Sequence, residues 1–183
     1  MSVFTSSREK RLWFYTFLVL VTIITSLIFG VGLVPTIDQF LKDILFFYTM
    51  LALAITVVLH GLITRPRKEE ITIWLGLSVV FLWLYSRLSF AERGHLFEYS
   101  ILAIFIHKAL IERTIQGIKI RYPALSALLI AFAIGVLDEF IQLFIPSRVF
   151  DPLDILFNGF VAFMAIGGSS VIRWVRKTIS KDS

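Results

Sequence analysis

The chain has 183 residues, of which 57% are hydrophobic and 17% charged, and its mean hydropathy is +0.84. These values lie outside the range of soluble domains, so they exclude a soluble globular enzyme and predict an integral membrane protein. Because the chain has no cysteine, disulfides, thiolate metal ligands and a cysteine nucleophile are excluded as well.

Six apolar stretches follow one another along the chain. They cover residues 12–34, 44–63, 71–86, 95–111, 123–145 and 153–175. Each is close to the roughly 20 residues that a helix needs to cross a bilayer, although the third and fourth are short. The sequence therefore predicts an all-α fold, a polytopic membrane bundle of six transmembrane helices that forms a single domain over residues 1–183.

Residues that start helices agree with these stretches. Pro123 is suited to open the fifth helix, and Asp151 stands before Pro152 as an N-cap of the sixth. Ser89 and Glu92 have the spacing of a capping box at the start of the fourth.

The distribution of Lys and Arg predicts the orientation of the bundle. These residues concentrate before the first stretch, in the second and fourth loops and in the tail. The few in the other loops are Lys42, Arg87, Arg93 and Arg148. Both termini are therefore expected in the cytoplasm. The first stretch lacks a cleavage pattern and is expected to remain as an anchor. The net charge of +5 indicates topology and attraction to anionic headgroups rather than nucleic-acid binding.

Polar and charged residues interrupt the later apolar stretches in two short runs. The first is Glu92, His95, Glu98 and Tyr99; the second is Asp138, Glu139, Gln142, Arg148, Asp151 and Asp154, followed by Asn158. With the predicted topology, all of them lie in the outer half of the membrane. Their three- and four-residue spacings place them on one face of each of three helices. Such residues are costly in lipid, so the three faces are expected to meet in an outward-facing site.

The charges of this set do not balance. The set contains six carboxyl groups but only three nearby arginines, Arg87, Arg93 and Arg148, and one histidine, His95. An excess of negative charge therefore remains. Three explanations remain open. Some carboxyls are protonated, which suits general acid and base chemistry. A divalent metal is bound, for which the suitable ligands are Glu92, His95, Asp138 and Glu139. Several side chains face bulk water.

Capping and helix packing explain part of the pattern without any chemistry. Glu92 and Asp151 can act as capping residues, and Asp154 can stabilise the positive end of the sixth helix. Tyr99, Gln142 and Asn158 can form hydrogen bonds between helices.

Candidate roles follow from residue type. The candidate catalytic residues are His95, Glu98, Asp138, Glu139 and Asp154, and the candidate substrate-binding residues are Tyr99, Gln142, Arg148, Asp151 and Asn158. His95, Asp138 and Glu139 are the hardest to explain structurally, because they are ionisable groups deep in apolar sequence. His60 and His107 are expected to be interfacial, and no serine has a nucleophile-elbow pattern around it.

The order of these polar residues resembles the VanZ-like family. The resemblance rests on the segment Glu92-Arg93-Gly94-His95-Leu96-Phe97-Glu98-Tyr99-Ser100-Ile101-Leu102, then Asp138-Glu139, Gln142, Pro146-Ser147-Arg148, Asp151, Asp154 and Asn158-Gly159. It covers about residues 90–168, which is less than half of the chain. Ser147 stands where the family usually has glycine.

The resemblance implies a protein of the bacterial cytoplasmic membrane that is associated with resistance to glycopeptide antibiotics of the teicoplanin type. Two functions are compatible with the residues. One is a membrane enzyme, a hydrolase or transferase, acting on a lipid or lipid-linked wall precursor at the outer leaflet. The alternative is a binder of a lipid, an ion or a lipidated glycopeptide that does not transform it.

Overall fold

The computed structural model describes residues 4–33, 68–88, 90–145 and 149–179, together with isolated positions at 38, 40, 41, 44 and 48. Its helices are α1 (Ser7–Leu33), α3 (Lys68–Arg87), α4 (Phe90–Ile115), α5 (Pro123–Gln142) and α6 (Pro152–Ile179). No strand occurs in these residues. All five helices are long and apolar enough to cross a membrane. The described part of the chain is thus all-helical and of the multi-pass membrane type, as predicted.

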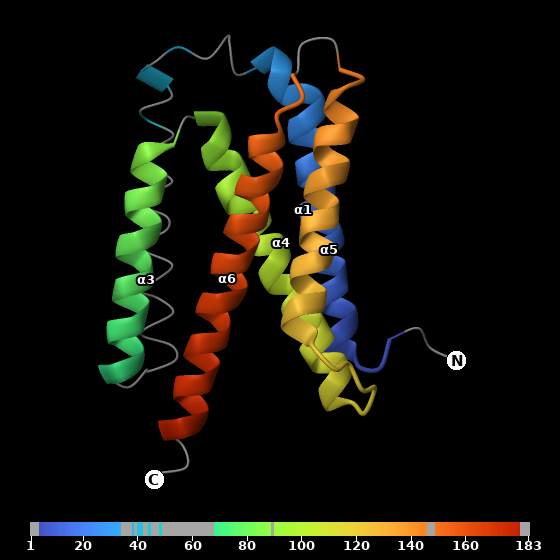
Figure 1. Ribbon diagram of the computed structural model, residues 1–183, viewed down its shortest axis with the longest axis vertical. Helices are drawn as coiled ribbons and strands as arrows, with labels where there is room; N and C mark the ends of the chain where they lie inside the picture. Colours follow the sequence, from blue (N-terminus) through green and yellow to red (C-terminus); the bar gives the residue numbers. More distant parts are fainter. Residues whose placement is uncertain are drawn as a thin grey trace.

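The helices stand side by side along the long axis of the molecule (Figure 1). α1, α3 and α5 run in one direction and α4 and α6 in the other, so α1 begins and α6 ends at the same end of the bundle (Figure 1). α4 packs against α1, α5 and α6, whereas the main described contact of α3 is with α6. α4 therefore forms the centre of the bundle, and Tyr99, Leu102 and Ile106 on it are fully buried.

Three helix boundaries have clear local causes. Pro123 occupies the first turn of α5, where the missing amide hydrogen costs nothing. The carboxylate of Asp151 accepts a hydrogen bond from the Leu153 amide at 2.8 Å, which is the predicted N-cap of α6. α4 ends at Ile115, and Gly117 follows it with a φ of 98°, which permits the amide of Ile118 to donate to the carbonyl of Arg113 at 3.2 Å.

Most of the observed helices are longer than the apolar stretches predicted for them. α1 starts five residues before the predicted one, and α4 covers Phe90–Ile115 where residues 95–111 were expected. The extra turns contain Arg and Glu residues that lowered the apolar signal. The predicted stretch 44–63 and the Ser89 part of the capping box lie outside the described residues.

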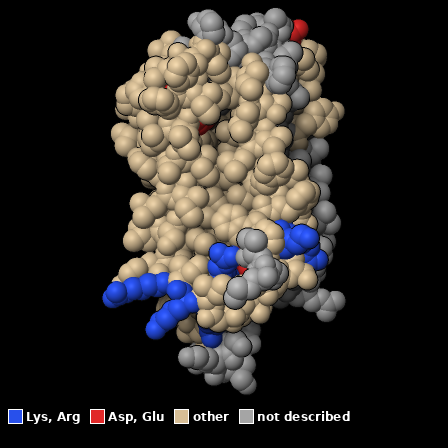
Figure 2. All heavy atoms as spheres, turned by 90° about the vertical axis from the view of Figure 1, so that its right-hand side faces the viewer, with Lys and Arg blue, Asp and Glu red and all other residues tan. Residues whose placement is uncertain are grey.

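Apolar side chains cover the middle of the bundle, and charge gathers at its ends. Lys and Arg side chains lie toward the end at which α1 begins, with an uncharged band above them (Figure 2). Large apolar residues such as Phe14, Leu129 and Phe163 are exposed on the described helices. An exposed apolar belt is what a membrane-spanning bundle presents to lipid.

The basic end also contains a buried ion pair that the sequence analysis missed. Glu9 of α1 is 0% exposed, and its Oε1 lies 2.8 Å from Nε of Arg113 on α4. The indole of Trp13 donates to the same oxygen at 3.2 Å, and the Thr5 hydroxyl donates to Oε2 at 2.6 Å. A second pair joins the same two helices, between Arg8 and Glu112 at 3.5 Å. These contacts fix the start of α1 against the end of α4.

Candidate functional site

The predicted polar faces of α4, α5 and α6 meet at the end of the bundle opposite the basic end. On α4 and α5 the contact is between Tyr99 and Asp138, where the tyrosine hydroxyl donates to Oδ2 of the carboxylate at 3.1 Å. Nδ1 of His95 lies 3.9 Å from the same oxygen, which is within ion-pair range but too long for a hydrogen bond. The His95 ring stacks beside Tyr99 with centroids 6.0 Å apart. Two α4 side chains therefore converge on one α5 carboxylate.

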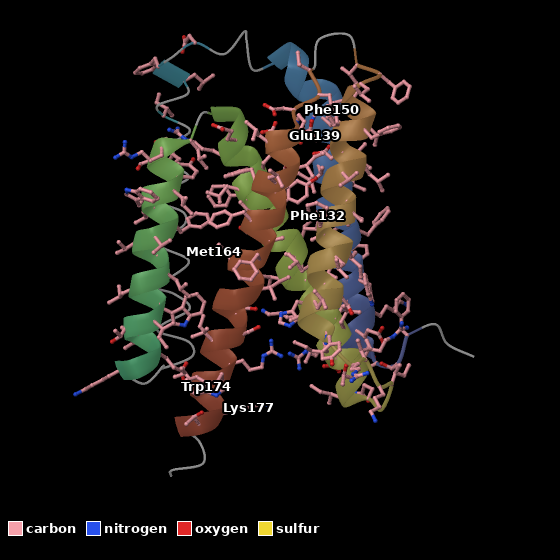
Figure 3. All side chains as sticks on the ribbon, viewed as in Figure 1. Phe132, Glu139, Phe150, Met164, Trp174 and Lys177 are labelled. Atoms are coloured by element: carbon pink, nitrogen blue, oxygen red, sulfur yellow. The ribbon has the colours of Figure 1, made fainter. Side chains whose placement is uncertain are left out.

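Glu139 joins α5 to the start of α6. Its side chain is 0% exposed, and it lies at the upper end of these two helices in Figure 3. Oε1 accepts a hydrogen bond from the amide of Gln142 at 2.8 Å, and Oε2 accepts one from the backbone amide of Asp151 at 3.1 Å. Both oxygens thus have donors, and one donor belongs to the residue that caps α6.

Asn158 completes the contact from α6. It is 1% exposed, and neither its amide nitrogen nor its amide oxygen has a hydrogen-bond partner in the described structure. Nδ1 of His95 is likewise buried without a hydrogen bond. Leaving a buried polar group unpaired typically costs about 1–3 kcal/mol, so these atoms are suited to receive groups of a ligand.

A glycine makes this close approach possible. A Cβ at Gly135 of α5 would lie 3.3 Å from Cβ of Asn158 and 3.5 Å from Cε1 of Tyr99. Small residues allow membrane helices to approach one another closely. Gly135 was not among the predicted site residues, and its only sequence signal was a small residue one turn before Asp138.

The remaining predicted residues surround this core. Glu98 faces α1, where the hydroxyl of Ser26 donates to its Oε1 at 3.0 Å. It remains close enough to act electrostatically on His95 and Asp138. Asp154, in the first turn of α6, acts in the same way on Glu139. Ser26 was missed because a single hydroxyl in an apolar helix carries no signal by itself.

Three further residues belong to the charge argument. Glu92 lies half-buried in the first turn of α4. Arg93, counted as a counter-ion in the charge argument, has its guanidinium on the Tyr85 ring at 4.9 Å and donates to the Tyr85 carbonyl. Arg148 lies outside the described residues.

The suggested metal site is not formed in the described structure. No group of three or more His, Cys, Asp or Glu side chains there is arranged to hold a metal ion. Glu92, His95, Asp138 and Glu139 therefore do not form a common set of ligands. The physical reason is that Glu139 turns toward Gln142 and the Asp151 amide, whereas His95 approaches Asp138.

The prediction that His107 is interfacial was wrong. Its ring is 3% exposed, and Nδ1 lies 3.4 Å from the hydroxyl oxygen of Ser169 on α6. α6 covers this face of α4, which a sequence reading of α4 alone does not show. His60 lies outside the described residues.

The arrangement resembles a proton-transfer or ligand-binding site more than a structural contact. The carboxylate of Asp138 contacts an imidazole and a phenol. A second carboxylate accepts two hydrogen bonds nearby, and a buried amide has no hydrogen-bond partner among the described residues. Comparison of the chain with protein-family models, curated proteins and solved structures finds no match.

Proposed function

We propose that this protein is a VanZ-like membrane protein whose outer polar cluster acts on a lipid or lipid-linked cell-envelope substrate. The observation that carries the proposal is the convergence of Tyr99, His95 and Asp138 beside an unpaired Asn158 amide. Polar groups buried within membrane-spanning helices have a function by default, because lipid penalises them strongly.

The roles of the residues follow from their contacts. His95 and Asp138 exchange a proton with the substrate, since Nδ1 of His95 has no hydrogen-bond partner among the described residues and lies 3.9 Å from Oδ2 of Asp138. Tyr99 positions Asp138. Asn158 binds a polar substrate group, and Arg148 is proposed to hold a phosphate, for which a guanidinium is suited. Glu139 shapes the site by holding the start of α6.

The proposal includes a topology and a location. Six transmembrane helices with both termini in the cytoplasm would place the cluster at the outer leaflet of a bacterial cytoplasmic membrane. There it would meet phospholipids, lipid-linked wall precursors or a teicoplanin-type antibiotic. The gathering of Lys and Arg at the opposite end of the bundle supports this orientation (Figure 2).

The test compares substrate turnover by the parent protein with turnover by Asp138→Asn and His95→Gln variants. Each purified protein is incubated in vesicles with a phospholipid or a lipid-linked wall precursor, and released headgroup is quantified by mass spectrometry. We expect both variants to lose roughly 100-fold or more of the parent rate, as is usual for loss of an acid–base group. Glu112→Gln and His107→Gln, buried residues at the other end of α4, are the matched controls and should retain the rate.

Binding without turnover is the alternative, favoured by the unpaired amide of Asn158. In that case no product forms with any substrate, and Asn158→Ala lowers saturable binding of the lipid or glycopeptide. Full turnover by folded Asp138→Asn and His95→Gln variants would contradict the catalytic proposal. If the parent protein shows neither turnover nor saturable binding, both functions are contradicted.

A further inference from the structure

An apolar groove lies on the opposite face of α4 from the polar cluster. Its volume is about 420 Å³, and the described residues that line it belong to α3, α4 and α6. Representative lining residues are Leu77 of α3, Ile104 of α4, and Phe160 and Met164 of α6; Met164 is labelled in Figure 3. The volume falls within the roughly 300–1,000 Å³ usual for ligand pockets, and the walls are suited to an apolar ligand.

The groove is long and runs parallel to the helices. On α6 its lining extends from Phe160 to Ile172, a length of about 18 Å at the rise of an α-helix. This shape fits an extended acyl chain. Because these three helices are apolar enough to cross a membrane, we expect the groove at the depth of lipid tails.

Basic residues continue the walls of the groove toward the basic end of the bundle. Lys108 follows Ile104 by four residues on α4, and Arg173 follows Ser169 by four residues on α6. Lys108 thus lies one helical turn beyond Ile104, the last lining residue of α4. Arg173 lies one turn from Ser169 and directly follows Ile172, the last lining residue of α6. Arg173 and Lys108 are close enough to repel each other, and both act electrostatically on the buried His107.

The described ion pairs at this end do not include these two cations. Glu9 pairs with Arg113, and Glu112 pairs with Arg8. A third acid, Glu70 of α3, is buried at the same end and has contacts of its own. Arg173 is half-buried, and partial removal of a guanidinium from water favours an anionic partner.

We propose that the groove binds one anionic glycerophospholipid, with its phosphate at Arg173 and Lys108 and an acyl chain between α3, α4 and α6. The positive charges of Arg173 and Lys108 favour an anionic headgroup, and the length of the apolar groove favours an extended acyl chain. Ser169 and His107 lie between the two regions, at the level where the ester groups of such a lipid would be. This site is separate from the outer polar cluster and goes beyond the proposed function, so either can fail without the other.

The test is native mass spectrometry of the full chain in detergent with phosphatidylglycerol and phosphatidylcholine of identical acyl chains. We expect one phosphatidylglycerol to remain bound, with a preference of roughly tenfold or more from two cations. Glycerol 3-phosphate in excess should not displace it, because the tail contributes most of the affinity. Equal retention of the two lipids, or displacement by glycerol 3-phosphate, would overturn the proposal.

Substitution of the cations tests the headgroup contact. The double variant Arg173→Gln/Lys108→Gln should lose the preference for phosphatidylglycerol, and Arg173→Lys should retain most of it. Lys119→Gln is the matched control, because Lys119 is an exposed cation in the loop after α4. A preference that survives in the double variant, or that falls equally in the control, contradicts the assignment.

A second variant tests the tail contact without touching any charge. A Cβ at Gly168 would lie 3.3 Å from Cδ1 of Leu77, whereas a Cβ at Gly167 meets nothing within 4 Å. Gly168→Leu should therefore fill the groove and greatly reduce cross-linking by a phosphatidylglycerol with a photoreactive group in its acyl chain. Gly167→Leu is the control and should retain cross-linking. Cross-links in the parent that map only to α1 and α5 would refute the groove as the binding site.

Discussion

Two carboxylates at opposite ends of the bundle are completely buried, and their surroundings differ. Glu139 accepts two uncharged donors, whereas Glu9 contacts a guanidinium, an indole and a hydroxyl. Glu139 was identified from the sequence because it interrupts a long apolar run. Glu9 was not, since an acid in the first turn of a helix beside Arg8 and Lys10 is ordinary. Only the contact with α4 distinguishes it from a solvated residue.

Glu9→Gln should destabilise the protein. The change leaves Arg113 without its carboxylate, and breaking a buried ion pair by removing one partner typically costs about 3–5 kcal/mol, less here because Arg113 is partly exposed. The measurement is thermal unfolding of the purified protein in detergent, with Lys10→Gln as the control for loss of one charge in the same turn. An equal midpoint for parent and Glu9→Gln would show that the pair contributes no net stability.

At the scale of elements, glycines determine how closely α5 and α6 approach. A Cβ at Gly159 of α6 would lie 2.8 Å from Cδ2 of Phe132 on α5, which is shorter than a normal contact. Gly135 of α5 is nearly as close to Asn158 of α6. α5 and α6 approach one another closely beside Asn158 and Phe132 because these two positions carry no side chain. The sequence contains the glycines, but their role depends on which helices are neighbours.

Gly159→Ala should separate α5 from α6 and lower stability by about 1–3 kcal/mol, the usual cost of overpacking. Gly76→Ala on α3 is the matched control, because its Cβ would meet nothing within 4 Å. Since alanine is the better helix former, the control should be unchanged or slightly stabilised. Unfolding midpoints of the two variants decide between these outcomes, and a Gly159→Ala protein as stable as the parent would rule out the tight contact.

The whole molecule has two chemically different ends separated by an apolar belt. Acids, amides and an imidazole lie where α5 ends and α6 begins. Basic residues gather where α1 begins and α6 ends (Figures 1 and 2). This asymmetry is the basis for the proposed orientation and for placing the two proposed ligand sites at opposite ends.

Single cysteines can test this orientation without interference, because the chain has no cysteine of its own. Val149→Cys, between α5 and α6, should react with a membrane-impermeant maleimide added to intact cells. Lys119→Cys, in the loop between α4 and α5, should react only after the cells are permeabilised. Both original side chains are exposed. Reaction of both variants in intact cells, or of Lys119→Cys alone, would contradict cytoplasmic termini.

The sequence by itself determined the membrane class, the approximate helices and the candidate polar cluster, because apolar length and charged residues within apolar stretches are properties of the chain alone. It also identified Asp151 as the cap of α6, since capping is local. The tertiary structure decided which groups meet: Asp138 with Tyr99 and His95, Glu98 with Ser26, Glu9 with Arg113, and His107 with Ser169. Among the described residues it brings no three His, Cys, Asp or Glu side chains together as metal ligands. Helix periodicity gives the faces of each helix, but the packing of α4 among its neighbours determines which faces are opposite one another.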